Sequence, residues 1–390
     1  MAVINTFNDV VPIAVAALDE VAQEMVGAIA GVRRDAKTDQ IKKGQTLNVP
    51  LVPDATEEDI TPAMAIPETG AQTTDTVSVA MTNFKAYPFT LTGEEDAALG
   101  IEVADGIIKN SIAQAMRKSV NSMEAYLLTK LYKGASRATG TAGTTPFASN
   151  YNTILELQKI LDDNGAPGTN DPSLRTLVID TAAALKLGQL SSLAQVNTAG
   201  SDALLRNGVL LPISGFSIRK SAGVQYHTAG AASGQLINNA SGEAVGQTTL
   251  TLDTITVNTT GIKAGDVITH ASDSANKYVV KTGLVATAGD IVINKPGLLV
   301  AAANNDAVSI GSSYRANVAF ARSAAVLCTR IPFRPRVGDK SVDIKLLTDP
   351  RTGITWALAL YQGYHSARWQ LEIAYDAAVI KPEFIATLMG

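Results

Sequence analysis

The side chains that most often carry out chemistry in proteins are few and scattered in this chain. The three histidines, His227, His270 and His365, form no pair at metal-ligand spacing, and Cys328 is the only cysteine. A thiolate zinc site needs several cysteines, so this composition disfavours one. The sequence has no G-x-x-x-x-G-K-[S/T] phosphate loop, no G-x-G-x-x-G turn and no G-x-S-x-G elbow. We therefore predict no catalytic, cofactor-binding or metal-binding residues, no cofactor and no enzymatic activity.

Two groups of carboxylates remain as candidates for acid-base chemistry or metal binding. Glu94, Glu95 and Asp96 stand at the expected start of a helix, and Asp349 opens a turn that ends at Gly353. Acidic residues are favoured at a helix N-terminus by the helix dipole, and Asp in a turn accepts a hydrogen bond from the nearby backbone. These structural roles explain both groups, so neither indicates an active site.

The most informative feature is a segment without lysine or arginine, from Gly44 to Phe84. Two stretches of alternating apolar residues, starting at Leu47 and at Val77, predict the two strands of a long hairpin with a proline-rich tip between them. Its carboxylates are Asp54, Glu57, Glu58, Asp59, Glu68 and Asp75. An acidic arm of this length has little core of its own, so we expect it to contact a neighbouring subunit.

A long amphipathic helix is predicted directly after the hairpin, from about Ala97 to about Tyr132. Apolar residues recur at spacings of three and four, which places them on one face of a helix. Thr92 and Glu95 have the spacing of a capping box at its start, and Gly134 is a plausible end. The opposite face is basic, with Lys109, Arg117, Lys118 and Lys130, followed by Lys133 and Arg137.

The composition predicts a protein of several domains with much of its surface buried between subunits. At 390 residues the chain exceeds the size of a single hydrophobic core. Only 17% of the residues are charged, which is low for a soluble monomer. The net charge of −4 gives no electrostatic case for binding nucleic acid or membranes. Cys328 lies in an apolar run and is expected to be a small buried hydrophobe, and the start of the chain lacks a signal-peptide pattern.

The remaining sequence predicts an α+β fold interrupted by a β-rich region. Helix and strand patterns alternate from Tyr151 to Ile218, and three strictly alternating strands follow Ala319. Between them, from about Ala222 to Ser312, short strands recur at the spacing of a small barrel or sandwich. The expected strands there are 249–252, 266–269, 277–281, 290–293 and 307–310.

This order of parts resembles the major capsid (coat) protein of tailed double-stranded DNA bacteriophages, with the Hong Kong 97-type fold. The segments 205–208, 215–218 and 349–353 are similar to short sequence motifs that are common in these coat proteins. The β-rich region resembles the inserted β domain of short-tailed enteric phage coat proteins. The resemblance implies an N-terminal arm at 1–35, an extended β-hairpin loop and strand at 36–92, a peripheral domain with a spine helix at 93–150, an axial domain at 151–221 and 313–390, and an inserted β-barrel at 222–312.

The resemblance also implies a function and partners. The chain would self-assemble, as hexamers and pentamers, into the icosahedral head shell that encloses the phage double-stranded DNA genome. A scaffolding protein, a portal and packaged DNA without sequence-specific contacts are the implied partners, with assembly in the host cytoplasm, no membrane and a final location in the virion. Some relatives cross-link through a lysine in the extended loop, but Gly44 to Phe84 has none, so we expect a non-covalent shell.

Two other functions remain as alternatives, and an enzyme with a β accessory domain is a third, which would need a pocket of convergent polar groups. One is a prophage-derived cellular encapsulating shell, which would hold a protein cargo in place of DNA. The other is a secreted β-rich adhesin, which the Thr-, Gly- and Asn-rich region suggests and the missing signal peptide disfavours.

The expected subunit interface joins the acidic hairpin of one subunit to the basic helix face of the next. Rim charges set register and rate more than affinity, so the apolar residues of the hairpin are expected to contribute more binding energy. The predicted interface residues are Glu57, Glu58, Asp59, Ile60, Met64, Ile66, Lys109, Arg117 and Lys118.

Overall fold

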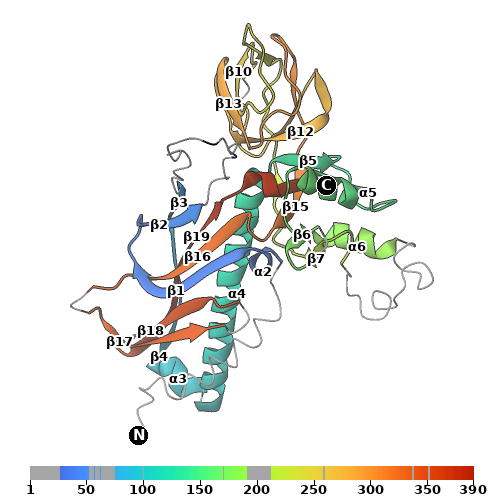
Figure 1. Ribbon diagram of the computed structural model, residues 1–390. Helices are drawn as coiled ribbons and strands as arrows, with labels where there is room; N and C mark the ends of the chain where they lie inside the picture. Colours follow the sequence, from blue (N-terminus) through green and yellow to red (C-terminus); the bar gives the residue numbers. More distant parts are fainter. Residues whose placement is uncertain are drawn as a thin grey trace.

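The structure is a computed structural model of the 390-residue chain (Figure 1). It describes residues 27–51, 57, 62, 75–99, 101–169, 171–190, 212–257, 260–335, 338–349 and 352–390. Most of the predicted N-terminal arm (1–35) and the distal part of the hairpin lie outside these residues.

One long helix is the central element, as the sequence predicts. Helix α4 (Ile101–Lys133) follows the short helix α3 (Gly93–Leu99), and both come after strand β4 (Asn83–Thr92). The predicted capping box forms: the backbone N–H of Thr92 donates to Glu95 at 2.9 Å, and the N–H of Glu95 donates to the Thr92 hydroxyl at 3.3 Å. The predicted apolar face is buried, including Ile112, Met116, Met123, Leu127 and Leu131.

A six-stranded sheet packs on α4. The sheet contains β4, β1 (Arg33–Ile41), β16 (Ala325–Pro332), β17 (Ser341–Thr348), β18 (Thr355–Gly363) and β19 (Ser366–Val379). On its inner face the Trp356 indole donates to the Ser119 hydroxyl of α4 at 3.1 Å, and Phe89 stacks on Trp369 with ring centroids 5.4 Å apart. Strand β1 pairs in parallel with β16, which local sequence patterns do not predict.

Strand β17 has the predicted alternation, but its apolar row faces outward. Val342, Ile344 and Leu346 are 51%, 38% and 50% exposed. They neighbour small residues of β18, since Ile344 pairs with Ala359 and Leu346 with Ala357. β17 is the last strand of the sheet, and the exposure of these three side chains shows that nothing in the described part of the chain covers the row.

A second sheet carries the elements predicted around residues 151 to 218. Helices α5 (Asn152–Asp163) and α6 (Thr181–Gln189) lie in a core of their own with its strands. The short elements α2 (Ala28–Gly31) and η1 (Pro382–Phe384) flank these parts of the chain. The strands are β5 (Arg137–Gly140), β6 (Arg175–Ile179), β7 (Ser217–Lys220), β15 (Tyr314–Ala321) and β20 (Ile385–Met389).

All five strands predicted in the β-rich region are present, with bounds shifted by a few residues. They enclose a separate hydrophobic cluster, and in Figure 1 they lie at one end of α4, opposite α3 and the β17–β18 end. Strand β12 also pairs with β5, so the region continues the second sheet; the predicted domain boundaries remain predictions. The strands are β8 (Tyr226–His227), β9 (Leu236–Ile237), β10 (Thr249–Asp253), β11 (Val267–His270), β12 (Asp273–Thr282), β13 (Gly289–Ile293) and β14 (Val308–Ile310).

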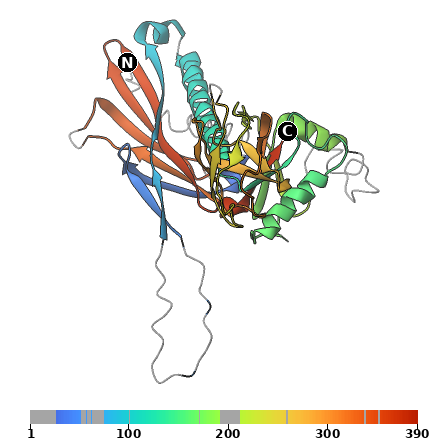
Figure 2. The same ribbon diagram turned by 90° about the horizontal axis from the view of Figure 1, so that it is seen from above.

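The hairpin root is formed by β2 (Thr46–Leu51) and β3 (Asp75–Ala80). The two predicted strands are confirmed, and they pair antiparallel with Leu47 opposite Val79 and Val49 opposite Val77. Figure 2 shows β3 and β4 following one another as one nearly continuous extended ribbon that leads up to α3.

Candidate subunit interface

The hairpin root is fixed to the body by a small apolar cluster. Val49, Val79 and Met81 pack with Val326 and Cys328 of β16. Burial raises the pKa of the Cys328 thiol to about 11, which keeps it protonated and agrees with the predicted role as a buried hydrophobe.

A buried carboxylate also ties the root to the long helix. Asp376 of β19 accepts hydrogen bonds from the Thr82 hydroxyl at 2.7 Å and from the Tyr126 hydroxyl of α4 at 2.8 Å. The direction in which the hairpin leaves the body is therefore set by both apolar packing and charged hydrogen bonds, which are the stronger class.

The structure places only one of the predicted hairpin contact residues. Glu57 is exposed. The others lie outside the described residues: Glu58, Asp59, Ile60, Met64 and Ile66.

The predicted basic residues lie on α4 as expected, with different exposure. Arg117 and Lys118 are exposed, while Lys109 is half-buried. Lys118 lines a groove of about 560 Å³ between β4 and α4, whose wall includes Phe89 and Ile107. A groove with an apolar wall and a cation at its edge can accept an acidic, partly apolar segment.

Arg137 does not extend this basic face, contrary to the sequence expectation. Its side chain is 3% exposed and donates to the Ile160 carbonyl and to Asn164, both at 3.2 Å. Burial lowers its pKa, and the nearby Asp163 partly offsets that effect. Arg137 therefore joins β5 to α5 inside the subunit.

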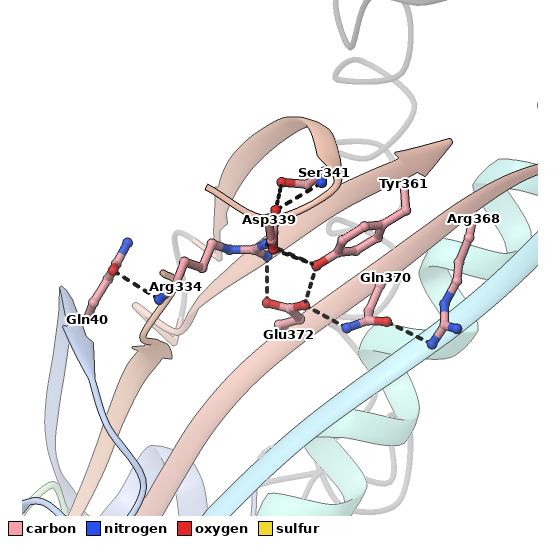
Figure 3. Close-up of polar contacts among 8 residues, drawn as sticks. All are labelled: Gln40, Arg334, Asp339, Ser341, Tyr361, Arg368, Gln370 and Glu372. Atoms are coloured by element: carbon pink, nitrogen blue, oxygen red, sulfur yellow. Dashed lines mark hydrogen bonds and ion pairs between the residues drawn. The ribbon is translucent and has the colours of Figure 1, made fainter. Parts of the chain in front are cut away.

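A polar network lies on the sheet beside β17 (Figure 3), and the sequence patterns did not indicate it. Arg334, from the loop after β16, contacts Asp339 at 2.5 Å, Glu372 at 2.6 Å and the Tyr361 hydroxyl at 3.0 Å. Hydrogen bonding from Ser341 is the main cause that lowers the pKa of Asp339 to about 2. The network links Arg334 and Asp339 to Tyr361 of β18 and Glu372 of β19, beside the exposed edge strand β17.

Phe333 is a further exposed apolar residue, near the β1 side of the sheet and away from β17. It is 55% exposed and comes directly after β16, where its backbone N–H donates to the Ile41 carbonyl at 2.9 Å. Exposed apolar side chains, such as the β17 row and Phe333, favour packing with another chain.

The candidates for chemistry have structural partners. His227 contacts Asp266 at 2.7 Å and His270 contacts Asp306 at 3.0 Å, both in buried positions. Asp349 accepts a hydrogen bond from the Thr352 backbone N–H at 3.2 Å, as aspartates in turns commonly do. Among the described residues, no group of three or more His, Cys, Asp or Glu side chains could hold a metal ion. No helix among the residues that the structure describes is long and apolar enough to cross a membrane.

Comparisons with known proteins find solved structures that are similar to this one, but no family and no curated protein that matches by sequence. The solved structure "Mycobacterium phage Che8" is similar at TM-score 0.43 and 15% identity, covering 91% of this chain and 92% of that one. "Capsid structure of the Cyanophage P-SCSP1u" is similar at TM-score 0.48 and 12% identity, covering 94% and 91%. "Asymmetric unit of bacteriophage PhiM1 mature capsid" is similar at 0.46 and 11%, covering 94% and 87%.

Two of these three structures are described as phage capsids, the class of protein that the sequence resembles. All three TM-scores are below 0.5, so the function proposed below rests on the geometry of this chain.

Proposed function

We propose that this protein is the major capsid protein of a tailed phage and assembles into the icosahedral shell around a double-stranded DNA genome. The observation that carries the proposal is the hairpin root. Six residue pairs join β2 to β3, and the root is anchored to β16, β19 and α4. A rigidly mounted acidic hairpin without cations is suited to bind another copy rather than its own body.

The proposed contact places the hairpin of one subunit along α4 of the next. Glu57, Glu58 and Asp59 face the cations Lys109, Arg117 and Lys118, and the groove beside Lys118 accepts apolar side chains. Ile60, Met64 and Ile66 supply most of the binding energy, since desolvated apolar contacts outweigh exposed ion pairs.

The exposed row on β17 supplies a second surface for the same assembly. Permanent interfaces bury roughly 2,000–5,000 Å² and are more apolar than transient ones. A chain with 17% charged residues and an uncovered apolar edge strand is suited to contacts of that kind. Repetition of these contacts under closed symmetry stabilises the shell.

The finer features of the proposal follow from the same assembly. Subunits form hexamers and pentamers in the host cytoplasm, with a scaffolding protein and a portal, and the finished shell is part of the virion. Because the segment from Gly44 to Phe84 contains no lysine, the shell is held together without covalent cross-links through this loop. The region 222–312 acts as an inserted domain in this arrangement.

The test is sedimentation and negative-stain microscopy of the chain expressed alone and then with the products of neighbouring genes. Closed shells or curved sheets in either preparation support the proposal, and a stable monomer in both rejects it. Particles that contain protein cargo and no nuclease-protected DNA would instead identify a cellular encapsulating shell.

A further inference from the structure

A hollow of about 510 Å³ lies where the hairpin root, the end of α4 and the β-rich region meet. Its walls include Val79 of β3, Ala264 and Val379. Three cations from two elements line it: Lys130 and Lys133 of α4, and Lys281 of β12. We call this hollow the lysine socket.

The three ammonium groups have no anionic partner among the described residues. Lys130 lies over the ring of Tyr126 at 5.3 Å, and Lys133 lies over the ring of Tyr132 at 5.9 Å. Such cation–π contacts restrain the side chains without neutralising them. Lys130 and Lys133 are therefore restrained by the rings and remain available to bind an anion.

Cations are favoured at the C-terminus of a helix by its dipole, which gives the two lysines on α4 a structural role, but two observations go beyond that role. Asn294 already donates to the terminal carbonyls of Lys133 at 2.9 Å and Ala135 at 2.8 Å. Lys281 belongs to a strand and lines the same hollow. Among the described residues that line the hollow, Asp376 is the only carboxylate, and it is held by Thr82 and Tyr126.

We propose that the lysine socket binds the carboxylates of the acidic hairpin of a second copy of this chain. The proposal rests on the proposed function and extends the receptor for the hairpin from Lys109, Arg117 and Lys118 to the far end of α4. The occupant is identified by charge, because the segment from Gly44 to Phe84 has six carboxylates and no cation.

The lengths of the two partners agree. Lys109 and Lys130 are about 30 Å apart along α4 at the helical rise per residue. One hairpin limb, from 52 to 63, spans at most about 36 Å when extended. A single hairpin lying along α4 can therefore contact both groups of cations.

The described part of the same subunit's hairpin does not supply these carboxylates. Its root forms one wall of the socket through Ser78, Val79 and Ala80. Four residues of regular strand lie between Ala80 and Asp75, the next carboxylate along β3, which is a separation of about 17 Å. The proposal therefore assigns the carboxylates in the socket to a second copy.

The direct test is carbodiimide cross-linking of assembled particles, since this reagent joins an ammonium and a carboxylate only where they touch. Particles are assembled from an equal mixture of ¹⁴N and ¹⁵N subunits and digested with trypsin. Because the hairpin lacks lysine and arginine, it is recovered as one peptide, residues 44–85.

We expect mixed-isotope cross-links between this peptide and peptides that contain Lys130, Lys133 or Lys281. Cross-links from Lys109 or Lys118 alone, with the socket lysines still open to acetylation in the particle, would overturn the proposal. Failure to form any particle would reject the proposed function instead, so the two failures are distinguishable.

A charge reversal outside α4 provides a second test. Lys281→Glu should raise the subunit concentration needed for assembly by about fivefold to tenfold, because it replaces attraction by repulsion at every copy of the contact. The matched control is Lys186→Glu on α6, an equally exposed lysine that does not line the socket. Equal behaviour of the two variants, both with the thermal unfolding of the wild type, would contradict the socket. Wild-type assembly that is promoted by added DNA, together with loss of that response in Lys281→Glu, would point to a phosphate ligand and would also overturn it.

Discussion

At the scale of single residues, Glu124 joins the described start of the chain to α4. It is 1% exposed and accepts the backbone N–H groups of Ala28 at 2.7 Å and Ile29 at 3.0 Å. Burial raises its pKa above the ordinary value of 4.5, although these hydrogen bonds and the charge of Arg219 act in the opposite direction. A raised pKa in the folded state means that the folded protein retains a proton that the unfolded chain has lost.

This linkage predicts how Glu124→Gln changes stability with pH. The contribution of the wild-type carboxyl is present below pH 4.5 and is lost as the pH rises through the raised folded value. The amide accepts at one atom only, so the variant should lose about 1–3 kcal/mol, with the larger loss at low pH. Urea unfolding of unassembled subunits between pH 4.5 and 8 measures this. A difference that grows toward high pH would show that the folded pKa is lowered instead.

At the scale of elements, the apolar row of β17 is exposed, whereas the apolar row of β18 is buried in the core. Replacing Ile344 and Leu346 together by threonine should change the free energy of unfolding by less than about 0.5 kcal/mol, because both are exposed and threonine suits a strand. Leu358→Ala on β18, which is fully buried, should cost about 2–5 kcal/mol. Chemical denaturation of unassembled subunits measures both values.

The same pair of variants tests the proposed role of the β17 edge. The double threonine variant should fold normally and assemble poorly. In the neighbouring polar network, Arg334→Lys should weaken the contacts with Asp339 and Glu372. A double threonine variant that is as unstable as Leu358→Ala would mean that the row packs inside the subunit.

At the scale of the whole molecule, assembly should depend on the sign of charge on the hairpin. Reversing Glu57, Glu58 and Asp59 to lysine should prevent shell formation while leaving the subunit folded, since Glu57 is exposed and the root is held by separate contacts. Sedimentation velocity and circular dichroism measure the two outcomes. Normal shells from this variant would contradict the proposed contact.

Two controls separate local charge from total charge. Neutralisation to Gln, Gln and Asn should give an intermediate effect, because it removes attraction without adding repulsion. Asp290→Lys, an exposed change on β13, should assemble normally. Added salt should partly restore the reversal variant, as screening weakens repulsion between exposed charges.

The sequence by itself determined the elements whose pattern is local. The capping box, the apolar face of α4, the two strands of the hairpin root and the five short strands all follow from spacing, because helix and strand hydrogen bonds repeat at fixed intervals. Lys109, Arg117 and Lys118 lie on α4 as predicted, and their role in an interface stays a prediction.

Only the tertiary structure decided which faces are covered and which distant residues meet. Asp35 and Arg330 pair although they are 295 residues apart, and no local pattern records such a contact. Alternation in β17 indicates a strand but not whether its apolar side faces a core or a partner. Likewise Lys281 joins Lys130 and Lys133 only because β12 packs beside the end of α4. Packing between elements that are distant in sequence decides which side chains are buried and which exposed side chains lie next to one another. The candidate interface consists of the exposed groups.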